Sequence, residues 1–522
     1  MSKENSRRYA FDGSNSLSIS TLLRQAATRS PGRIFATHGN DALSIRDLDS
    51  LADRIAGHLG ALISKRARVA VMARNSPAVA ALILAISRLG AVWVPINPAL
   101  RSTGLSYIIK HSQPHIVLTD DEHFEICSLA VQTVTGSNGT VLRLDNLTNA
   151  PSSPSHFEEA VTQPDETFAV MYTSGTTGPP KGVEVTSRMM LAAAEAVIYV
   201  ADVKPGDRMF MWEPMYHIGG AQMLIVPLLV DAELRLSARF SASQFWDEVS
   251  RTKCTHIHYL GGILQMLLKQ PSSPLDRLHG TRVAWGGGCD KATWIEFSKR
   301  FGLELRECYG MTETSSIATA NVNGVTGSVG TAVPWFNVSV VHPETKTPVA
   351  TGETGEILVE ELRPGLLSPG YYQNEVATKE SRHGSKSRLL TGDLGYFDPD
   401  GNLIFLGRIS DSFRVRGENV SSWDVEHVAR EHPDVADCAL VGVKAEVGEF
   451  DLKLFLEPRP GASIDFAPFS AWLSQRLAAF QNPRYLAIAE QFDRTPSQRI
   501  MKHFLSKNVD DCFDRFALKD SR

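Results

Sequence analysis

Residues 68–97 have the sequence RVAVMARNSPAVAALILAISRLGAVWVPIN, and this stretch decides the fold class of the first part of the chain. Arg68–Ala73 is a short apolar run with branched side chains, which predicts a buried strand. The Asn-Ser-Pro sequence at 75–77 predicts a helix start, helical spacing follows, and Gly90 is placed to end the helix. Ala91–Ile96 is strand-like again, so the stretch predicts a βαβ unit and a parallel sheet with covered faces.

The rest of the chain is organised as a large α/β body followed by a smaller C-terminal segment. The apolar run His115–Thr119 continues the predicted sheet, and a polar loop at 144–167 leads to another predicted strand, Phe168–Tyr172. Residues 330–405 are β-rich, with a hairpin signal where Asp-Gly at 400–401 precedes an apolar run. About a hundred residues remain beyond this hairpin, which suits an independent lid.

Composition excludes several classes of protein. The 522 residues contain 53 Lys and Arg against 58 Asp and Glu, a formal charge of −5, which argues against a main partner with a nucleic acid backbone. The six cysteines are scattered without metal-ligand spacing, so they are expected to be reduced thiols. The N-terminus lacks the apolar region of a secretory signal, and the apolar runs at 78–86 and 219–230 are too short to cross a bilayer. We therefore expect a cytoplasmic enzyme without a transmembrane segment.

A loop rich in glycine and hydroxyl side chains carries the strongest chemical signal. It has the sequence YTSGTTGPPKG at residues 172–182 and leaves a predicted strand. Glycines let backbone N–H groups approach an anion closely, hydroxyls donate further hydrogen bonds, and Lys181 adds a positive charge. The spacing differs from that of a Walker loop. The predicted anion-binding residues are Thr173, Ser174, Gly175, Thr176, Thr177, Gly178 and Lys181.

This loop and several later motifs resemble those of the adenylate-forming superfamily of acyl-CoA synthetases, luciferases and peptide-synthetase adenylation domains. Tyr309–Thr314 is similar to the segment of that family that contacts adenine and metal, and Thr391–Asp393 resembles its ribose-binding step. Gly407-Arg408 and the later 416–420 resemble its domain junction, so the resemblance covers about residues 20–506 in order. Segments 414–426, 240–246 and 259–262 look most like crotonobetaine/carnitine-CoA ligases.

The resemblance implies a fold and a division into domains. It implies a large N-terminal domain of layered α/β subdomains plus a β-barrel-like subdomain, and a small mobile α+β C-terminal domain. The expected boundaries are an AMP-binding domain at 1–407, a hinge at 408–411 and a lid at 412–522.

The resemblance also implies a reaction, in which a carboxylate attacks the α-phosphorus of ATP, pyrophosphate leaves, and coenzyme A takes the acyl group from acyl-AMP. The loop would hold the pyrophosphate, and Glu313 would ligate Mg²⁺. Asp393 would accept the ribose hydroxyls, and Arg408 would donate to the ribose or a phosphate. The other residues implied to bind ATP or coenzyme A are Gly288, Tyr309, Gly310, Thr312 and Gly417. The residues implied to border the acyl substrate are His217, Tyr259, Gly286 and Gly287, the alternatives being a packed core histidine and a tight glycine turn.

The sequence departs from the family pattern at two places. Where the family has a catalytic lysine in a T-P-x-G-K-I string, this chain has Arg499, with Lys502 three residues later. The expected catalytic residues are therefore Lys181, Glu313 and one or both of these two cations. Ser410 stands at the expected hinge where the family has Asp or Lys.

Alternatives to an acyl-CoA ligase stay open at this point. The protein could instead pass the acyl group to a carrier protein, stop at acyl-AMP, or bind a nucleotide without catalysis. The sequence also leaves open which small or medium-chain acid is activated, with carnitine-like and betaine-like acids among the candidates, and whether the protein is a homodimer.

Overall fold

The protein is described here by a computed structural model of the 522-residue chain. The described residues are 18–136, 139–149, 157–173, 180–237, 239–409, 412–415, 418–445, 450–477, 479–494 and 500–517. The chain forms two compact units. Unit 1 comprises residues 1–338 and 359–389, and unit 2 comprises residues 339–358 and 390–522.

The βαβ unit predicted from the sequence forms the middle of a six-stranded sheet in unit 1. Its strands pair in the order β6-β5-β3-β4-β7-β8. Their bounds are β3 Arg68–Met72, β4 Val92–Pro95, β5 Ile116–Thr119, β6 Val141–Arg143, β7 Thr167–Thr173 and β8 Lys181–Thr186. Helix α4 (Pro77–Arg88) joins β3 to β4, with Ser76 as its N-cap, and Gly90 has the left-handed φ of 59° expected of a helix end. The predicted strand, helix and parallel pairing are all confirmed.

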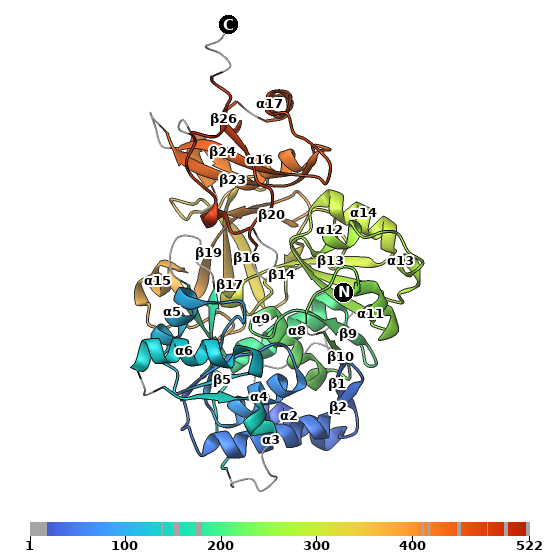
Figure 1. Ribbon diagram of the computed structural model, residues 1–522, viewed down its shortest axis with the longest axis vertical. Helices are drawn as coiled ribbons and strands as arrows, with labels where there is room; N and C mark the ends of the chain where they lie inside the picture. The colour runs from blue at the N-terminus through green and yellow to red at the C-terminus, as the bar shows by residue number, and fades with distance from the viewer. Residues whose placement is uncertain are drawn as a thin grey trace. The chain divides into compact units, whose positions relative to one another are not determined.

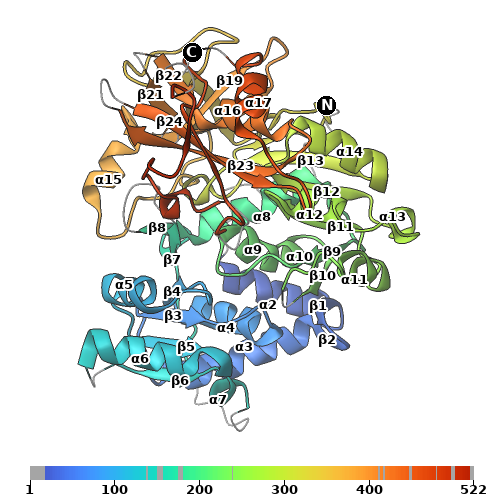
Figure 2. The ribbon, with the colours of Figure 1, turned by 45° about the horizontal axis from the view of Figure 1, so that its top comes forward.

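Both faces of this sheet are covered, as the continuous apolar strands require. Helices α5 (Ser102–Ser112) and α6 (Phe124–Thr135) bury Leu105, Ile109 and Val131 against β3 and β4. They lie together on one side of the sheet, and α3 (Ile45–Gly60) and α4 lie on the other (Figure 2). The sheet thus brings the end of β7 and the start of β8 to one edge, and the predicted anion-binding loop of residues 172–182, named the phosphate loop for that predicted role, connects them.

A second sheet of nine strands forms the rest of unit 1, in the order β15-β14-β13-β12-β11-β9-β10-β1-β2. Their bounds are β1 Ile34–His38, β2 Asp41–Ser44, β9 Arg208–Met211, β10 Glu233–Leu236, β11 His256–Leu260, β12 Val283–Gly287, β13 Glu304–Tyr309, β14 Thr319–Ala320 and β15 Thr331–Ala332. Strand β1 lies beside β10, almost two hundred residues later in the chain (Figure 1). The other longer helices of unit 1 are α2 Ile19–Arg29, α8 Ser187–Ala201, α11 Phe245–Arg251, α12 Ile263–Leu268, α14 Lys291–Phe301 and α15 Glu375–Glu380.

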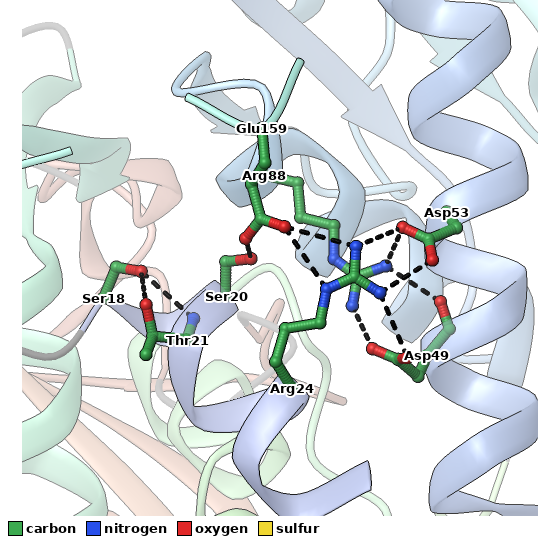
Figure 3. Close-up of polar contacts among 8 residues, drawn as sticks. All are labelled: Ser18, Ser20, Thr21, Arg24, Asp49, Asp53, Arg88 and Glu159. Carbon is green, nitrogen blue, oxygen red and sulfur yellow. Dashed lines mark hydrogen bonds and ion pairs between the residues drawn. The ribbon is translucent and has the colours of Figure 1, made fainter. Parts of the chain in front are cut away.

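A network of charged side chains joins the N-terminal helices to α4 (Figure 3). Arg88 has no exposed side-chain area and donates to the Asp53 carboxylate at 2.6 Å and to Asp49. Arg24 donates to the same two aspartates and to Glu159. The buried guanidinium is therefore compensated by carboxylates from α3, as a buried charge has to be.

Unit 2 combines residues from the β-rich middle of the chain with the C-terminal segment. Strands β16 (Phe336–Val341), β17 (Gly355–Glu361) and β19 (Ser385–Phe397) each contribute residues to both units. Strand β20 (Leu403–Arg408) pairs antiparallel with β19 through the predicted hairpin, in which Gly401 has a φ of 79°. The hairpin prediction is confirmed.

The C-terminal part of unit 2 is an α+β fold. Its strands β23 (Val435–Lys444), β24 (Phe450–Pro458), β25 (Tyr485–Ile488) and β26 (Phe513–Asp514) form a four-stranded sheet. Helix α16 (Ser422–Arg430) packs Val425 and Ala429 onto this sheet, with α17 (Phe466–Ser474) in the same core. A two-stranded sheet, β21 (Ser412–Val415) and β22 (Glu418–Ser421), precedes α16. Among the described residues, no helix has the length and apolar character needed to cross a membrane.

Candidate active site

The carboxyl ends of three parallel strands bring the predicted substrate and adenine segments together in unit 1. In the sheet register, Gly286 of β12 lies between Tyr259 of β11 and Glu307 of β13. Ligands of open α/β sheets bind at such carboxyl ends. The structure therefore places Tyr259, Gly286 and Gly287 side by side, with Tyr309 at the end of β13.

Gly286 has a structural reason to lack a side chain. A Cβ atom there would lie 1.9 Å from the carbonyl oxygen of Tyr259. Gly286 is buried within β12, Gly287 is half-buried, and the exposed Gly288 leaves the strand with a φ of 93°. Gly288 thus has the left-handed φ that favours glycine, but no turn is assigned there. Whether these glycines border the substrate stays a prediction.

The Glu307 side chain anchors the backbone of this glycine segment, and the sequence motifs did not include Glu307. Its carboxylate accepts hydrogen bonds from the Tyr259 hydroxyl at 2.5 Å, from the Cys289 backbone N–H at 3.0 Å, and from the Gly288 N–H. Burial raises the pKa of Glu307 to about 7, against the opposing effect of these three donors. Only the strand register revealed it, because an isolated Glu in a strand carries no sequence signal.

The predicted metal ligand Glu313 lies in a short 3₁₀ turn, η4 (Thr312–Thr314), just after β13. Its side chain is buried, with 5% of its area exposed, and Oε1 accepts a hydrogen bond from the Tyr371 hydroxyl at 2.8 Å. A Cβ atom at Gly310 would lie 2.2 Å from the Ser316 carbonyl oxygen, so this turn requires a glycine there. Thr312 is half-buried beside Glu313.

The phosphate loop is described only at its two ends. Thr173 ends β7 and pairs in register with Lys181, which begins β8. Lys181 is exposed, and its Nζ lies 5.1 Å from the centroid of the Tyr371 ring. Residues Ser174, Gly175, Thr176, Thr177 and Gly178 lie outside the described residues.

The segment predicted to border the acyl substrate is anchored by polar contacts. The Asn75 side chain donates to the Glu213 carbonyl at 2.8 Å and accepts from the Met215 N–H at 2.9 Å. Asn75 thus fixes this segment, and Ser76 rather than Asn75 caps α4. His217 is half-buried before the short helix α9 (Ile218–Ala221), and its predicted role stays a prediction.

A buried Glu–His pair supports the same segment. Oε2 of Glu213 lies 2.9 Å from Nδ1 of His258, and both side chains are buried. The Trp212 indole N–H donates to the His258 carbonyl at 2.7 Å, and the His258 ring lies against Trp285. His256 and His258 are both buried in β11. No motif or spacing in the sequence indicated that Glu213 is the partner of His258.

The predicted ribose-binding residues lie in unit 2. Asp393 is buried in β19 and stands opposite Arg408 in the register with β20. The Arg408 Nε lies 3.3 Å from Asp393 Oδ1, and the Asp393 N–H donates to the Thr391 hydroxyl at 3.2 Å. The neighbouring Gly392 N–H donates to Glu356 at 3.0 Å. The Arg408 contact orients the Asp393 carboxylate, and the other two contacts hold the backbone of β19 at this position.

Of the two candidate cations in the C-terminal segment, the structure describes Lys502 and not Arg499. Lys502 begins the turn η6 (Lys502–Phe504), and its Nζ lies 2.8 Å from Glu426 Oε1 of α16. Glu426 is buried and also accepts the Leu440 N–H at 2.7 Å. Arg499, Gly417 and the hinge residue Ser410 lie outside the described residues.

A layered α/β domain with a phosphate-loop strand pair, followed by a small α+β segment, defines the class of adenylate-forming enzymes. The chain belongs to the AMP-binding enzyme family: residues 23–372 match that family and residues 424–499 match the AMP-binding enzyme C-terminal domain. The family and the fold class expected from the sequence are both confirmed, as is the enzyme class, an AMP-forming acyl-CoA synthetase.

Three similar proteins illustrate the match. The 2-succinylbenzoate–CoA ligase of Bacillus licheniformis is 29% identical over 92% of this chain and 98% of its own length. The crotonobetaine/carnitine–CoA ligase of Salmonella heidelberg is 26% identical over 84% of this chain and 88% of its own. The O-succinylbenzoate coenzyme A synthetase of Bacillus subtilis, solved with ATP and magnesium ion, has a TM-score of 0.83 and 25% identity, covering 93% of this chain and 98% of that one.

Proposed function

We propose that the protein is an ATP-dependent ligase that converts a small or medium-chain carboxylic acid into its acyl-AMP and then into the coenzyme A thioester. The candidate acids include carnitine-like and betaine-like compounds, because the sequence resembles the carnitine ligases in three segments. The observation that carries the proposal is the contact of both Lys181 and Glu313 with the same side chain, Tyr371. A cation and a carboxylate are thereby held where the phosphate loop meets β8.

The first half-reaction joins two anions, so the protein has to compensate their repulsion. Lys181 supplies one positive charge next to the leaving pyrophosphate, and the loop supplies backbone and hydroxyl donors. Mg²⁺, bound by Glu313 together with phosphate oxygens, would neutralise further charge on the triphosphate. A single buried carboxylate fits this ion, because Mg²⁺ at phosphate sites usually takes one or two carboxylates and completes its shell with phosphate and water.

The nucleoside would be held by the β19–β20 hairpin. The Asp393 carboxylate would accept the ribose hydroxyls, and the Arg408 guanidinium, which already contacts it, would donate to the ribose or a phosphate. Because Arg408 contacts the carboxylate and Thr391 binds the Asp393 backbone N–H before the ligand arrives, little ordering remains to be done on binding.

We infer that Arg499, and not Lys502, replaces the lysine that the family uses during adenylation. Lys502 at 2.8 Å and Arg430 at 3.5 Å both contact the buried Glu426, so moving Lys502 to the phosphates would take the closer cation away from a buried carboxylate. Arg499 retains a positive charge with donors suited to phosphate oxygens. Lys502 then stabilises the C-terminal fold.

The test is carboxylate-dependent exchange of pyrophosphate into ATP, followed by coenzyme A-dependent release of AMP. The panel contains short-chain, medium-chain and quaternary-ammonium carboxylic acids. Lys181→Met is expected to lower both activities by about 10²-fold, because one well-placed donor to the transferring phosphates is lost. Lys299→Met, the same change on the exposed surface of α14, is the matched control.

The outcomes separate the alternatives. Exchange without any coenzyme A product would favour transfer to a carrier protein or release of acyl-AMP. Nucleotide binding without exchange across the whole panel, and without recovery in Arg499→Lys, would refute the ligase and favour a binding protein.

A further inference from the structure

Tyr371 belongs to a segment that the sequence motifs did not include. Its backbone extends the open edge of the six-stranded sheet, because Tyr371 forms an antiparallel bridge with Val183. On either side of it, the Tyr372 N–H donates to the Gly182 carbonyl at 2.7 Å, and the Gly370 carbonyl accepts from the Glu184 N–H at 3.0 Å. The segment is thus attached to β8 directly after Lys181.

The hydroxyl of Tyr371 fixes one oxygen of the Glu313 carboxylate. The two atoms lie 2.8 Å apart, and the Glu313 backbone carbonyl accepts a second bond from the Ser368 N–H at 2.9 Å. Because one carboxylate oxygen is held by a directed donor, rotation of the carboxylate plane is restricted. Removal of a group that hydrogen-bonds to a metal ligand typically lowers metal affinity by about 10–100-fold.

The aromatic ring of Tyr371 contacts the Lys181 ammonium at the same time. The ammonium lies 5.1 Å from the ring centroid, within the range of a cation–π contact. Tyr371 is itself fixed, since its N–H donates to the Thr378 hydroxyl at 2.9 Å. One aromatic side chain therefore contacts the metal ligand through its hydroxyl and the loop lysine through its face.

We propose that Tyr371 is a positioning residue that sets the Glu313 carboxylate for Mg²⁺ and holds Lys181 beside the same phosphates. This inference rests on the proposed function, because it assumes that the site binds Mg²⁺ and ATP. The hydroxyl acts on metal affinity and the ring acts on nucleotide affinity, so the two contributions are separable by substitution.

The experiment measures binding rather than turnover. Titration calorimetry gives the affinity for a non-hydrolysable ATP analogue in EDTA, and then the affinity for Mg²⁺ at saturating analogue. Tyr371→Phe retains the ring and is expected to weaken Mg²⁺ binding by about tenfold, with analogue affinity in EDTA unchanged. Tyr371→Leu removes the ring as well and is expected to weaken the analogue in EDTA by a further two- to fivefold, the order of an exposed cation–π contact.

Tyr372→Phe is the matched control, one residue further along. Among the described residues its hydroxyl accepts a side-chain hydrogen bond from Gln373 at 3.2 Å and does not contact Glu313, so Mg²⁺ affinity should stay at the wild-type value. A double-mutant cycle with Glu313→Gln tests the route of the effect. If Tyr371 acts through Glu313, Tyr371→Phe should change Mg²⁺ affinity less than twofold in that background.

Two results would overturn the inference: Mg²⁺ affinity of Tyr371→Phe equal to wild type, or a tenfold loss that persists in the Glu313→Gln background. A wild-type protein that binds neither the analogue nor Mg²⁺ would instead refute the proposed function. Thermal unfolding of the ligand-free variants shows whether a substitution causes a general loss of folding. If Tyr371→Phe does so, the Glu313→Gln single variant, in which the new side chain has nearly the volume of Glu313 and Tyr371 is unchanged, decides whether this carboxylate binds Mg²⁺ at all.

Discussion

Glu307→Gln is expected to remove a specific pH dependence from the stability of unit 1. Burial raises the pKa of Glu307 from its ordinary value of 4.5 to about 7 in the folded protein. Between these two pH values only the folded state keeps the proton, so the free energy of unfolding falls as pH rises. The contribution is fully present below pH 4.5 and is lost above about pH 7.

The size of this stability contribution follows from the difference between the folded-state pKa of Glu307 and its ordinary pKa. At about 1.4 kcal/mol for each pH unit, the interval from 4.5 to about 7 corresponds to about 3 kcal/mol. Glutamine cannot ionise, yet its carbonyl can accept the Gly288 and Cys289 N–H groups, while the Tyr259 hydroxyl can rotate to accept from its amide. The substitution therefore removes the titration and keeps most of the contacts.

The assay is urea unfolding followed by tryptophan fluorescence at half-unit steps from pH 4.5 to pH 8, for wild type and variant. The variant should gain about 3 kcal/mol relative to wild type across this range, with most of the change between pH 5 and pH 7. All other titrating groups are common to both proteins and cancel in the difference. The assignment of Glu307 as a buried group that keeps its proton would be refuted if the difference in free energy of unfolding between variant and wild type did not change with pH. It would also be refuted if wild type became more stable relative to the variant as pH rose.

Three further predictions concern charged side chains. Arg88→Met should lower the free energy of unfolding by about 2 kcal/mol, because Asp49 and Asp53 lose the buried guanidinium and are left with the partly exposed Arg24; urea unfolding that shows under 1 kcal/mol would contradict this. Lys502→Gln should destabilise unit 2 by about 1 kcal/mol, since the buried Glu426 loses its closer cation and retains the contact with Arg430, and this should appear as a lower unfolding midpoint. Arg499→Ala should lower ATP–pyrophosphate exchange by about 10²-fold while Lys502→Gln stays within about threefold; the reverse order would assign the catalytic cation to Lys502.

Sequence patterns predicted the local structure well where the signal is periodic. The strand, helix and strand of residues 68–97 follow from spacing and end residues alone, and the structure has them as predicted. The Asp-Gly hairpin before β20 follows from turn chemistry in the same way. These features depend on neighbours within a few residues, which the sequence shows directly.

The candidate site was predictable only in part. Lys181, Glu313 and Asp393 were expected from motifs, but Tyr371, Glu307 and the partner of His258 were not. Tyr371 meets Glu313 across 58 residues of chain, and Glu213 meets His258 across 45. A tyrosine in a turn or a glutamate in a strand has the same local sequence whether it faces solvent or a buried partner.

Local sequence patterns set which segments become strands and helices and which residue types are available for phosphate and metal chemistry. The tertiary structure alone decided which of these residues meet: Arg88, a helix-end cation by position, became a fully buried ion-pair partner, and Tyr371 came to lie between Lys181 and Glu313. The physical reason is that periodicity and turn chemistry act over a few residues, whereas ion pairs and hydrogen bonds across a sheet edge depend on strand order and register.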